Sequence, residues 1–560
     1  MDYKKAVDDK KKESADLHTR MDADSNLVNL TEYVLRDVNE KKVPRAISVT
    51  LNDPAVFAAN VESSLGSAVE QIAVESEDEK VDTHYIEDVV RACLVSANQR
   101  LIKQGRFSLN PYIDQQMCRR GRGAARCLFR MEEGQFIADI VPWDTRFLYY
   151  AMDVDGLAWA AYEPPKKYKD EIESDPWAKE IGFTISGEKA TILDIWTPKL
   201  NEIYVDGKKV YEQPNPCGYP PVCIQLVPMG SMLADANSKY QGESIFFLIR
   251  DLLPELNRLV SIIQSLNMKE LDHALLWKSR EGTTAEPPKF DDLTSPGRTI
   301  ATDIGGGAEP VSFGALKQQA WLLHSMIETR IQRGSLSNFE YGTFTQPMSA
   351  VALITVGEGR DQVFLPRLGA RGLLNQQLAV MLIDQIIKTG ERSVKIGTRG
   401  HKRSFDVAKL QGEYEITFNY FIKSPKIDMA RYSMAASIGN LIPDKAKRRE
   451  ILQREDPEED ERQLRWEEAE MISPAIKLNR IYNSLLEMAD KGDEDAEFEA
   501  ELVSKEMERL VGLAPGETEG KKATIPKKEG LLPMFGGTAA QPKSSAQKAA
   551  DLRRTPVEEE

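Results

Sequence analysis

The sequence is poor in cysteine and contains no long apolar run. Its five cysteines are odd in number and loosely spaced, which argues against a disulfide framework and favours a reducing compartment. No CxxC pair occurs, and the five histidines are distant from the cysteines, so we expect no zinc site. No stretch of about 18 apolar residues is present, so we expect no membrane-spanning helix. Residues 1–20 are charged and lack the apolar core of a signal peptide.

An excess of positive charge is also missing. Lysine and arginine number 73 against 88 aspartates and glutamates, which gives a formal net charge of −15. Proteins that grip duplex DNA normally carry a basic excess, because neutralising phosphates drives their affinity. We therefore do not expect the chain as a whole to bind nucleic acid tightly, although it could touch DNA locally or surround it without holding it.

The common motifs of catalysis are absent as well. The sequence has no phosphate loop, no GxSxG and no HExxH, and the three glycines at 305–307 are not followed by the Lys and Ser/Thr of a phosphate loop. His273 and His324 stand alone, and we interpret them as packing or surface residues. We therefore expect no enzymatic activity, no metal and no cofactor.

The feature that organises the chain is a pair of helices separated by an irregular excursion, over about 242–331. Apolar residues of the first helix recur with a period near 3.6, and Pro254 marks a kink or the start of a helical segment. The excursion is rich in Pro and Gly and cannot be helical throughout. Two helices that leave a body, carry a module and return suit a protein that lines something. The returning helix places Leu316, Ala320, Leu323, Met326 or Ile327, and Ile331 on one side.

The residues before this pair predict a mixed α+β body over 51–241, preceded by an arm over 1–50. Aromatic and β-branched residues indicate strands between 127 and 162. Asp206 and Gly207 are a hairpin turn signal. Other elements are predicted as helices at 27–38, 54–73, 86–104 and 168–180, and as a buried strand at 222–227.

A run of arginines interleaved with glycines lies inside this body. One interpretation is a phosphate-contacting basic patch. The other, which we favour because no aromatic stacking partner is interleaved, is a solvated turn before a strand or a surface of salt bridges between subunits. The arginines are Arg119, Arg120, Arg122, Arg126 and Arg130.

The chain after the returning helix begins with an aperiodic segment over 334–348. It carries Phe339, Tyr341 and Phe344, and a structureless segment of this size is usually functional or disordered. Then come a long bent helix, a strand and several helices, including an acidic one whose charges we interpret as a solvated face. Beyond 512 the sequence has few large apolar residues, so we predict a disordered tail. The predicted ranges are 349–388 for the long helix, 414–422 for the strand and 455–470 for the acidic helix.

Taken in order, these parts resemble the portal proteins of tailed bacteriophages. The segment with GESIFFLIRDLLPELNRLVSII looks like the first stem helix of portals, and SNFEYGTFTQPMSAVALITVGEGRDQ looks like their tunnel loop and the helix behind it. YEITFNYFIKSPKIDMARYSMAASIGNLIPDKAKRREILQREDPEEDERQLRWEEAE is similar to their closing strand and helical crown. The resemblance covers about 50–500. The arginine–glycine run has no clear counterpart in it.

The resemblance implies an α+β, mainly α, portal-type fold. Under it, Phe339, Tyr341 and Phe344 are candidates to line the channel, with Lys317 and Arg330 as stem candidates. The implied parts are an N-terminal arm over 1–50, a wing over 51–241, a first stem helix region over 242–277, a clip over 278–314, a second stem helix over 315–333, a tunnel loop over 334–348, a long kinked helix and wing strand over 349–424, a crown over 425–511 and a tail over 512–560.

The resemblance also implies a role and partners. It implies a ring of identical subunits, usually twelve, at one capsid vertex of a virion, assembled in the host cytoplasm as a late protein. Double-stranded DNA passes through the axial channel, driven in by the terminase large subunit, and later leaves through the tail. The other implied partners are the major capsid and scaffold proteins and the tail or adaptor proteins; no membrane and no cofactor is involved. A net-negative channel would repel phosphates and so avoid holding DNA.

Two other interpretations remain open from the residues. One is a non-viral α-helical scaffold or adaptor that binds proteins through its acidic helices, which predicts an elongated monomer or dimer. The other is a DNA-processing enzyme with an α+β body, which the missing motifs disfavour. A ring-sized mass in solution would distinguish the portal from both.

Overall fold

The computed structural model contains two compact units, Met1–Glu461 and Arg462–Glu560. Each unit is described by itself below. The architecture is mixed helix and sheet, as the sequence predicts. The structure describes residues 2–78, 80–132, 135–231, 238–271, 275–278, 307–310, 314–335, 350–398, 401–422, 432, 435–437, 442–452, 457–489 and 494–511. The predicted tunnel loop, most of the clip and the tail lie outside these residues.

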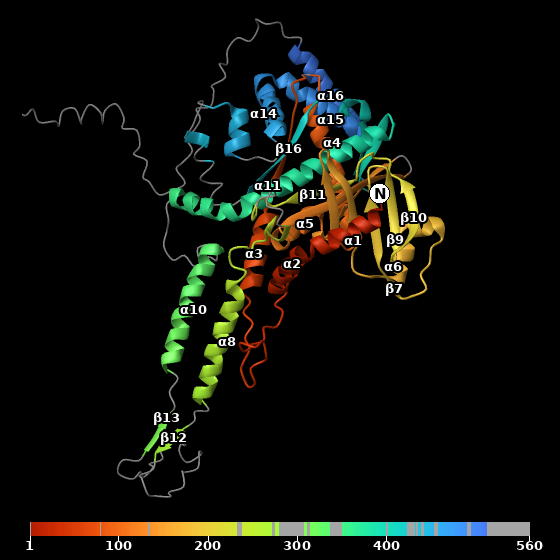
Figure 1. Ribbon diagram of the computed structural model, residues 1–560. Helices are drawn as coiled ribbons and strands as arrows, with labels where there is room; N and C mark the ends of the chain where they lie inside the picture. Colours follow the sequence, from red (N-terminus) through yellow and green to blue (C-terminus); the bar gives the residue numbers. More distant parts are fainter. Residues whose placement is uncertain are drawn as a thin grey trace, which may run out of the picture. The chain divides into compact units, whose positions relative to one another are not determined.

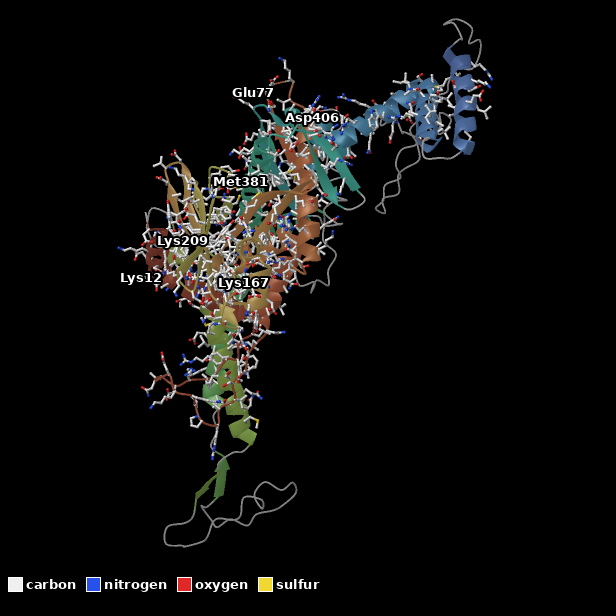
Figure 2. All side chains as sticks on the ribbon, turned by 90° about the vertical axis from the view of Figure 1, so that its right-hand side faces the viewer. Lys12, Glu77, Lys167, Lys209, Met381 and Asp406 are labelled. Carbon is white, nitrogen blue, oxygen red and sulfur yellow. The ribbon has the colours of Figure 1, made fainter. Side chains whose placement is uncertain are left out.

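A five-stranded sheet forms the centre of the first unit (Figure 1). Helices α4 (Thr83–Lys103), α5 (Leu109–Arg119) and α11 (Ala350–Lys388) pack against it. Met381 of α11 lies among the crowded side chains of the body, with its sulfur 3.4 Å from that of Cys223 (Figure 2). The strand order is β11 (Val222–Leu226), β2 (Arg122–Glu132), β3 (Gln135–Pro142), β14 (Ser393–Thr398) and β15 (His401–Asp406).

A two-stranded sheet joins distant parts of the chain. Strand β1 (Ala68–Glu75) pairs antiparallel with β16 (Glu415–Ile422) along its whole length. The predicted helix over 54–73 is therefore wrong in its second half: α3 (Asp53–Gly66) ends before β1 begins. Residues 68–75 form a strand because a partner more than 300 residues away supplies its hydrogen bonds. The spacing of apolar residues within the segment cannot reveal that partner.

The second five-stranded sheet contains the predicted hairpin. Asp206 and Gly207 connect β9 (Leu200–Val205) to β10 (Lys208–Pro214) with φ of 46° and 78°, which confirms the turn prediction. The helix predicted over 168–180 is two short helices, α6 (Lys169–Ser174) and α7 (Pro176–Ile181), because a helix cannot continue through Pro176. The small pair β6 (Lys167–Tyr168) and β7 (Lys189–Ala190) flanks them. The sheet order is β10 (Lys208–Pro214), β9 (Leu200–Val205), β8 (Ile192–Trp196), β5 (Gly156–Tyr162) and β4 (Leu148–Asp153).

The N-terminal residues are more ordered than an arm. Helices α1 (Tyr3–Glu13) and α2 (Ala15–Val28) pack on the body, and Val7 is buried against Tyr149 and Trp159. The helix predicted at 27–38 is wrong, since α2 ends at Val28 and the following residues are extended or turned. We call residues 29–52 the finger.

Helices α8 (Leu252–Leu271) and α10 (Gly314–Gly334) lie side by side and leave the body together (Figure 1). Pro254 sits in the first turn of α8, where its missing N–H costs nothing, so it starts the helix rather than kinking it. The predicted extension of this helix to 277 is wrong, because strand β12 (Leu275–Lys278) pairs with β13 (Gly307–Pro310).

The C-terminal helices are α14 (Pro457–Ile472), α15 (Pro474–Ala489) and α16 (Glu494–Val511), preceded by the short α13 (Asp444–Ala446). Within the second unit α15 packs on α16, and Arg480 lies 4.6 Å from the ring of Trp466. Ala500 is the one buried residue among its described side chains. Met471 and Ile472 are 79% and 84% exposed, so this unit leaves apolar surface in water.

Candidate functional site

The outer face of α10 carries exposed apolar side chains. The half-buried residues Ala320, His324, Ile327 and Ile331 recur at helical spacing and mark the side covered by α8. Among the described residues, no other element covers the remaining side of α10 in this way. Trp321, Leu322, Leu323 and Met326 are 55%, 66%, 46% and 56% exposed. Leu323 and Met326, which the sequence placed with the covered residues, therefore lie outside that side.

The residues predicted to meet DNA are only partly visible in the structure. Arg330 is exposed on α10. Lys317 lies in the first turn of the same helix, and its side chain is outside the described residues. Phe339, Tyr341 and Phe344 are also outside them. The predicted channel set is therefore not brought together here and stays a prediction.

The base of the helix pair begins at a close approach of two glycines. Gly121 and Gly242 both have φ near +70°, and a Cβ on Gly121 would lie 2.0 Å from the carbonyl oxygen of Gly242. Only glycine fits both the backbone conformation and the space. Arg122, next in the chain, donates to the carbonyl of Gln241 at 2.9 Å. The start of β2 is thus joined to the segment that leads into α8.

A buried ion network fixes the same base. Arg250 donates two hydrogen bonds to Asp24, at 2.6 and 2.9 Å, and one to Glu243 at 2.6 Å. Arg20 donates to three backbone carbonyls, including that of Gly242 at 2.9 Å, and lies 3.4 Å from Glu243. Asp24 and Glu243 are fully buried. Two cations balance two carboxylates, which is the condition under which buried charge is tolerated.

The environment of this network shifts several pKa values. Burial lowers the pKa of Arg20 to about 10, and Glu243 partly opposes the shift. Burial acts in the same direction on Arg250, but its hydrogen bonds to Asp24 and Glu243 hold its pKa above the usual value. Burial, assisted by Arg146, lowers the pKa of His18 to about 4. His18 is therefore neutral near pH 7, while Arg20 and Arg250 stay charged.

None of the arginines of the predicted basic patch is exposed, and four of them bond to other groups of the body. Arg119 forms a two-pronged pair with Glu62, at 2.7 and 2.9 Å. Arg120 donates to the carbonyl of Met21, and Arg126 lies 3.6 Å from both Asp139 and Asp194. With Arg122 buried as well, these contacts disfavour the phosphate interpretation for 119–126. The favoured solvated turn is also incomplete, since these side chains hold the body together.

The finger is attached to α8 through a ladder of side chains. Backbone N–H groups of Ile47, Val49 and Leu51 donate to Ser265, Ser261 and Asn257, at 3.0, 2.8 and 3.0 Å. Alternate residues of an extended chain are about 6.6 Å apart, close to the 6 Å rise of four helical residues, so the two spacings match.

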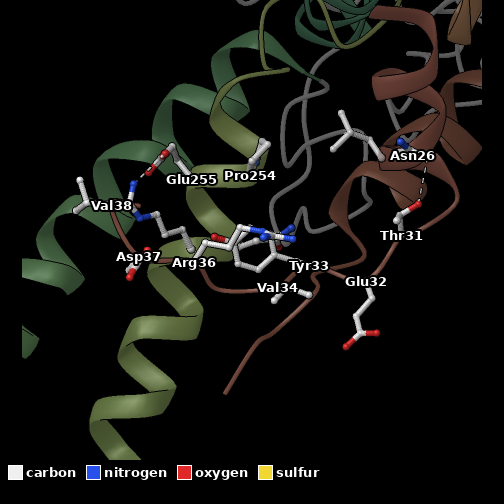
Figure 3. Close-up of a pocket in the computed structure, with 13 residues that line it drawn as sticks. Asn26, Thr31, Glu32, Tyr33, Val34, Arg36, Asp37, Val38, Pro254 and Glu255 are labelled. Atoms are coloured by element: carbon white, nitrogen blue, oxygen red, sulfur yellow. Dashed lines mark hydrogen bonds and ion pairs between the residues drawn. The ribbon is translucent and has the colours of Figure 1, made fainter. Parts of the chain in front are cut away.

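The finger is also folded on itself. The side-chain oxygens of Ser48 and Thr50 accept from the N–H groups of Leu35 and Tyr33, at 3.0 and 2.8 Å. An open pocket of about 680 Å³ lies between the finger and the start of α8 (Figure 3). Its lining combines apolar and charged side chains, including Tyr33, Val34, Arg36, Val38, Pro254 and Arg258.

Sequence reasoning missed both the network and the ladder. The ladder had a readable signal, since Asn257, Ser261 and Ser265 interrupt an apolar helix at a spacing of four. The network had none, because Asp24 lies more than 200 residues from its partner Arg250.

Neither a metal site nor a membrane span is found in the described part of the chain. No group of three or more His, Cys, Asp or Glu residues there is placed to hold a metal ion. None of the helices described combines the length and apolar character needed to cross a bilayer. The five cysteines are free and buried.

No family model matches the chain, and no curated protein is similar to it in sequence. Among solved structures, the chain is similar to one from the neck of an empty GTA particle computed with C6 symmetry. The TM-score is 0.36 with 14% identity, over 70% of this chain and 86% of the other. A chain from the neck of a native GTA particle computed with C12 symmetry gives 0.33 and 14%, over 65% and 88%. Similarity at this level does not assign the fold or a role.

Proposed function

We propose that the chain is a portal-type subunit, which forms a ring-shaped channel for double-stranded DNA at a capsid vertex. The observation that carries this proposal is the helix pair. Two helices leave the body together, are fixed at their base by buried ions, and expose Trp321, Leu322 and Met326 on α10. A two-helix projection with this much bare apolar surface needs neighbours, and copies related by rotation supply them on both sides.

The portal-like order of segments in the sequence supports the same role. The helix pair stands where the stem would be, and the segment between β12 and β13 stands where the clip would dock terminase and then a tail or adaptor protein. The net charge of −15 suits a channel that must let DNA slide. On this proposal the chain is part of the virion, binds capsid and scaffold proteins and catalyses no reaction.

The test is the mass and shape of the purified full-length chain. We expect rings with a central hole in negatively stained images, and a particle mass about twelve times 62.9 kDa. The measurement should be made at several salt concentrations and with a scaffold protein present, because ring assembly can depend on either. A monomer or dimer under all these conditions would contradict the proposal and favour the scaffold or adaptor interpretation.

A further inference from the structure

The finger is held in a strained conformation. Leu30, Glu40 and Arg45 have φ of 52°, 59° and 61°, a region that non-glycine residues rarely adopt. Asp206, in the hairpin turn, is the only other such residue in the described chain. Each residue in this region persists only where its surroundings hold it. The ladder to α8 holds the part of the finger that follows Arg45.

The finger and α10 cover nearly opposite faces of α8. At 100° per residue, the ladder residues Asn257, Ser261 and Ser265 point about 160° away from the buried leucine–isoleucine stripe. Figure 1 shows α10 on one side of α8 and the finger, in red, on the other. One copy therefore presents two different outer surfaces that face in opposite directions. The stripe consists of Leu256, Leu259 and Ile263.

The two surfaces also lie at the same height along the helix pair. The returning end of α10 touches the body beside α8, since a Cβ on Gly334 would lie 2.7 Å from Ile249. Counting back 13 residues from Gly334 gives Trp321, and counting the same number forward from Ile249 gives a position within the turn Ser261–Ser265. Rotation about an axis parallel to the helices keeps height, so these surfaces would meet in a ring.

We infer that the finger of one copy packs against the exposed face of α10 in the next copy, which makes the finger part of the ring interface. This inference rests on the proposed function. A ring needs a heterologous contact between two different surfaces, and the finger and α10 meet that requirement in direction and height.

The chemistry of the two surfaces fits this contact. Arg45 lies two residues before the ladder, and among the described residues no ion pair is formed by the finger's exposed cations, Arg36, Lys41, Lys42 and Arg45. On α10, Trp321 offers an aromatic face and Glu328 a carboxylate, both exposed. The face of a tryptophan ring attracts a cation, and tryptophan is enriched among the interface residues that contribute most to binding.

Cysteine cross-linking tests the inference, because all five native cysteines are buried. The double variant Arg45→Cys with Leu322→Cys is treated with a short bis-maleimide and run on a denaturing gel. We expect a series of covalent multimers larger than dimers from the double variant and at most dimers from either single variant. The matched control is Val154→Cys with Leu322→Cys, since Val154 is 97% exposed on the turn between β4 and β5. This control should give no covalent multimers larger than dimers.

The uncross-linked mass of the same samples separates the two ideas. A ring-sized mass without covalent multimers from the double variant overturns the finger contact and leaves the proposed function standing. A ring-sized mass with covalent multimers from the Val154 control as well overturns the specificity of the contact. A monomeric mass of the native chain under all the conditions given above overturns the proposed function and the finger contact together.

Discussion

The base of the helix pair and the outer face of α10 use charge and apolar surface in opposite ways. At the base, Asp24 and Glu243 are fully buried and bonded to arginines. On α10, Trp321 and Leu322 face water. Buried ions are specific in direction and distance but add little net stability, whereas exposed apolar side chains are a cost until another surface covers them. The difference indicates that the base fixes the direction of the helix pair, and that the outer face of α10 is suited to packing against another surface.

Helix α11 combines buried charge and exposed apolar side chains within one element. Arg367, Arg371 and Asn375 are buried on its inner side. Arg371 bonds to Asp114 at 2.6 Å. Leu365 and Leu373 are more than half exposed. The inner side of α11 also buries apolar residues such as Leu374 and Leu378, so only its exposed leucines resemble the outer face of α10.

The largest effect is expected from disrupting the buried ion network at the base of the helix pair. Arg250→Met should destabilise the first unit by about 3–5 kcal/mol, because it leaves two buried carboxylates short of a partner. Urea denaturation measures the loss. The control is Arg258→Met, which removes a half-exposed arginine 3.5 Å from Glu255 and should cost less than about 1 kcal/mol. Equal losses in the two variants would show that the network does not fix the base.

The next largest effect concerns pH and His18, which packs edge-on against Tyr149. Its pKa is 6.5 unfolded and about 4 folded, so the unfolded chain binds the extra proton between these values. Stability should therefore fall as pH drops through that window, by at most about 3 kcal/mol.

The measurement is the difference in unfolding free energy between the native chain and His18→Gln from pH 7 to pH 4. Asp114 titrates in the same window with the opposite sign, because burial, partly offset by Arg371, raises its pKa to about 6. That contribution is common to both chains and cancels in the difference. A difference that does not change with pH would show that His18 is not held neutral.

A third test removes the apolar side of the comparison. Trp321→Ala should weaken assembly by at least about 2 kcal/mol per interface, or roughly 30-fold in Kd, and leave the stability of the subunit unchanged. Sedimentation over a range of concentrations measures this, with Val154→Ala as the exposed control. Unchanged assembly would mean that this face of α10 is not part of the interface.

The smallest effect is expected from the ladder. Ser261→Ala should cost about 0.5–1.5 kcal/mol and speed hydrogen exchange at the Val49 amide, which donates its hydrogen bond to the Ser261 hydroxyl. Thr329→Ala is the matched control, since that hydroxyl bonds only to the carbonyl of Ser325 in its own helix among described contacts. Exchange at Val49 that matches the control would argue that the finger is held by something else.

Local patterns predicted the parts of the fold that local physics decides. The helix pair follows from the 3.6-residue period of Leu252–Ile263, and the β9–β10 turn follows from Asp206–Gly207. Strand β11 follows from a short apolar run bounded by prolines.

The rest depended on partners that are remote in sequence. Arg119 would read as a free cation without Glu62, and Arg371 would read as a solvent-facing residue without Asp114. Strand β1 needed β16. Charged residues can be read directly from a sequence, but the partners that neutralise them are seen only in the three-dimensional structure.

The contact of Gly334 with Ile249 has a further consequence. The chain leaves the body and re-enters it at one point, so everything between the two helix ends is, for the body, a single insertion. Its closure cost grows only slowly with length. The segment between α8 and α10 could therefore be lengthened or exchanged in related proteins, and so bind different partners, without altering the residues that fold the body.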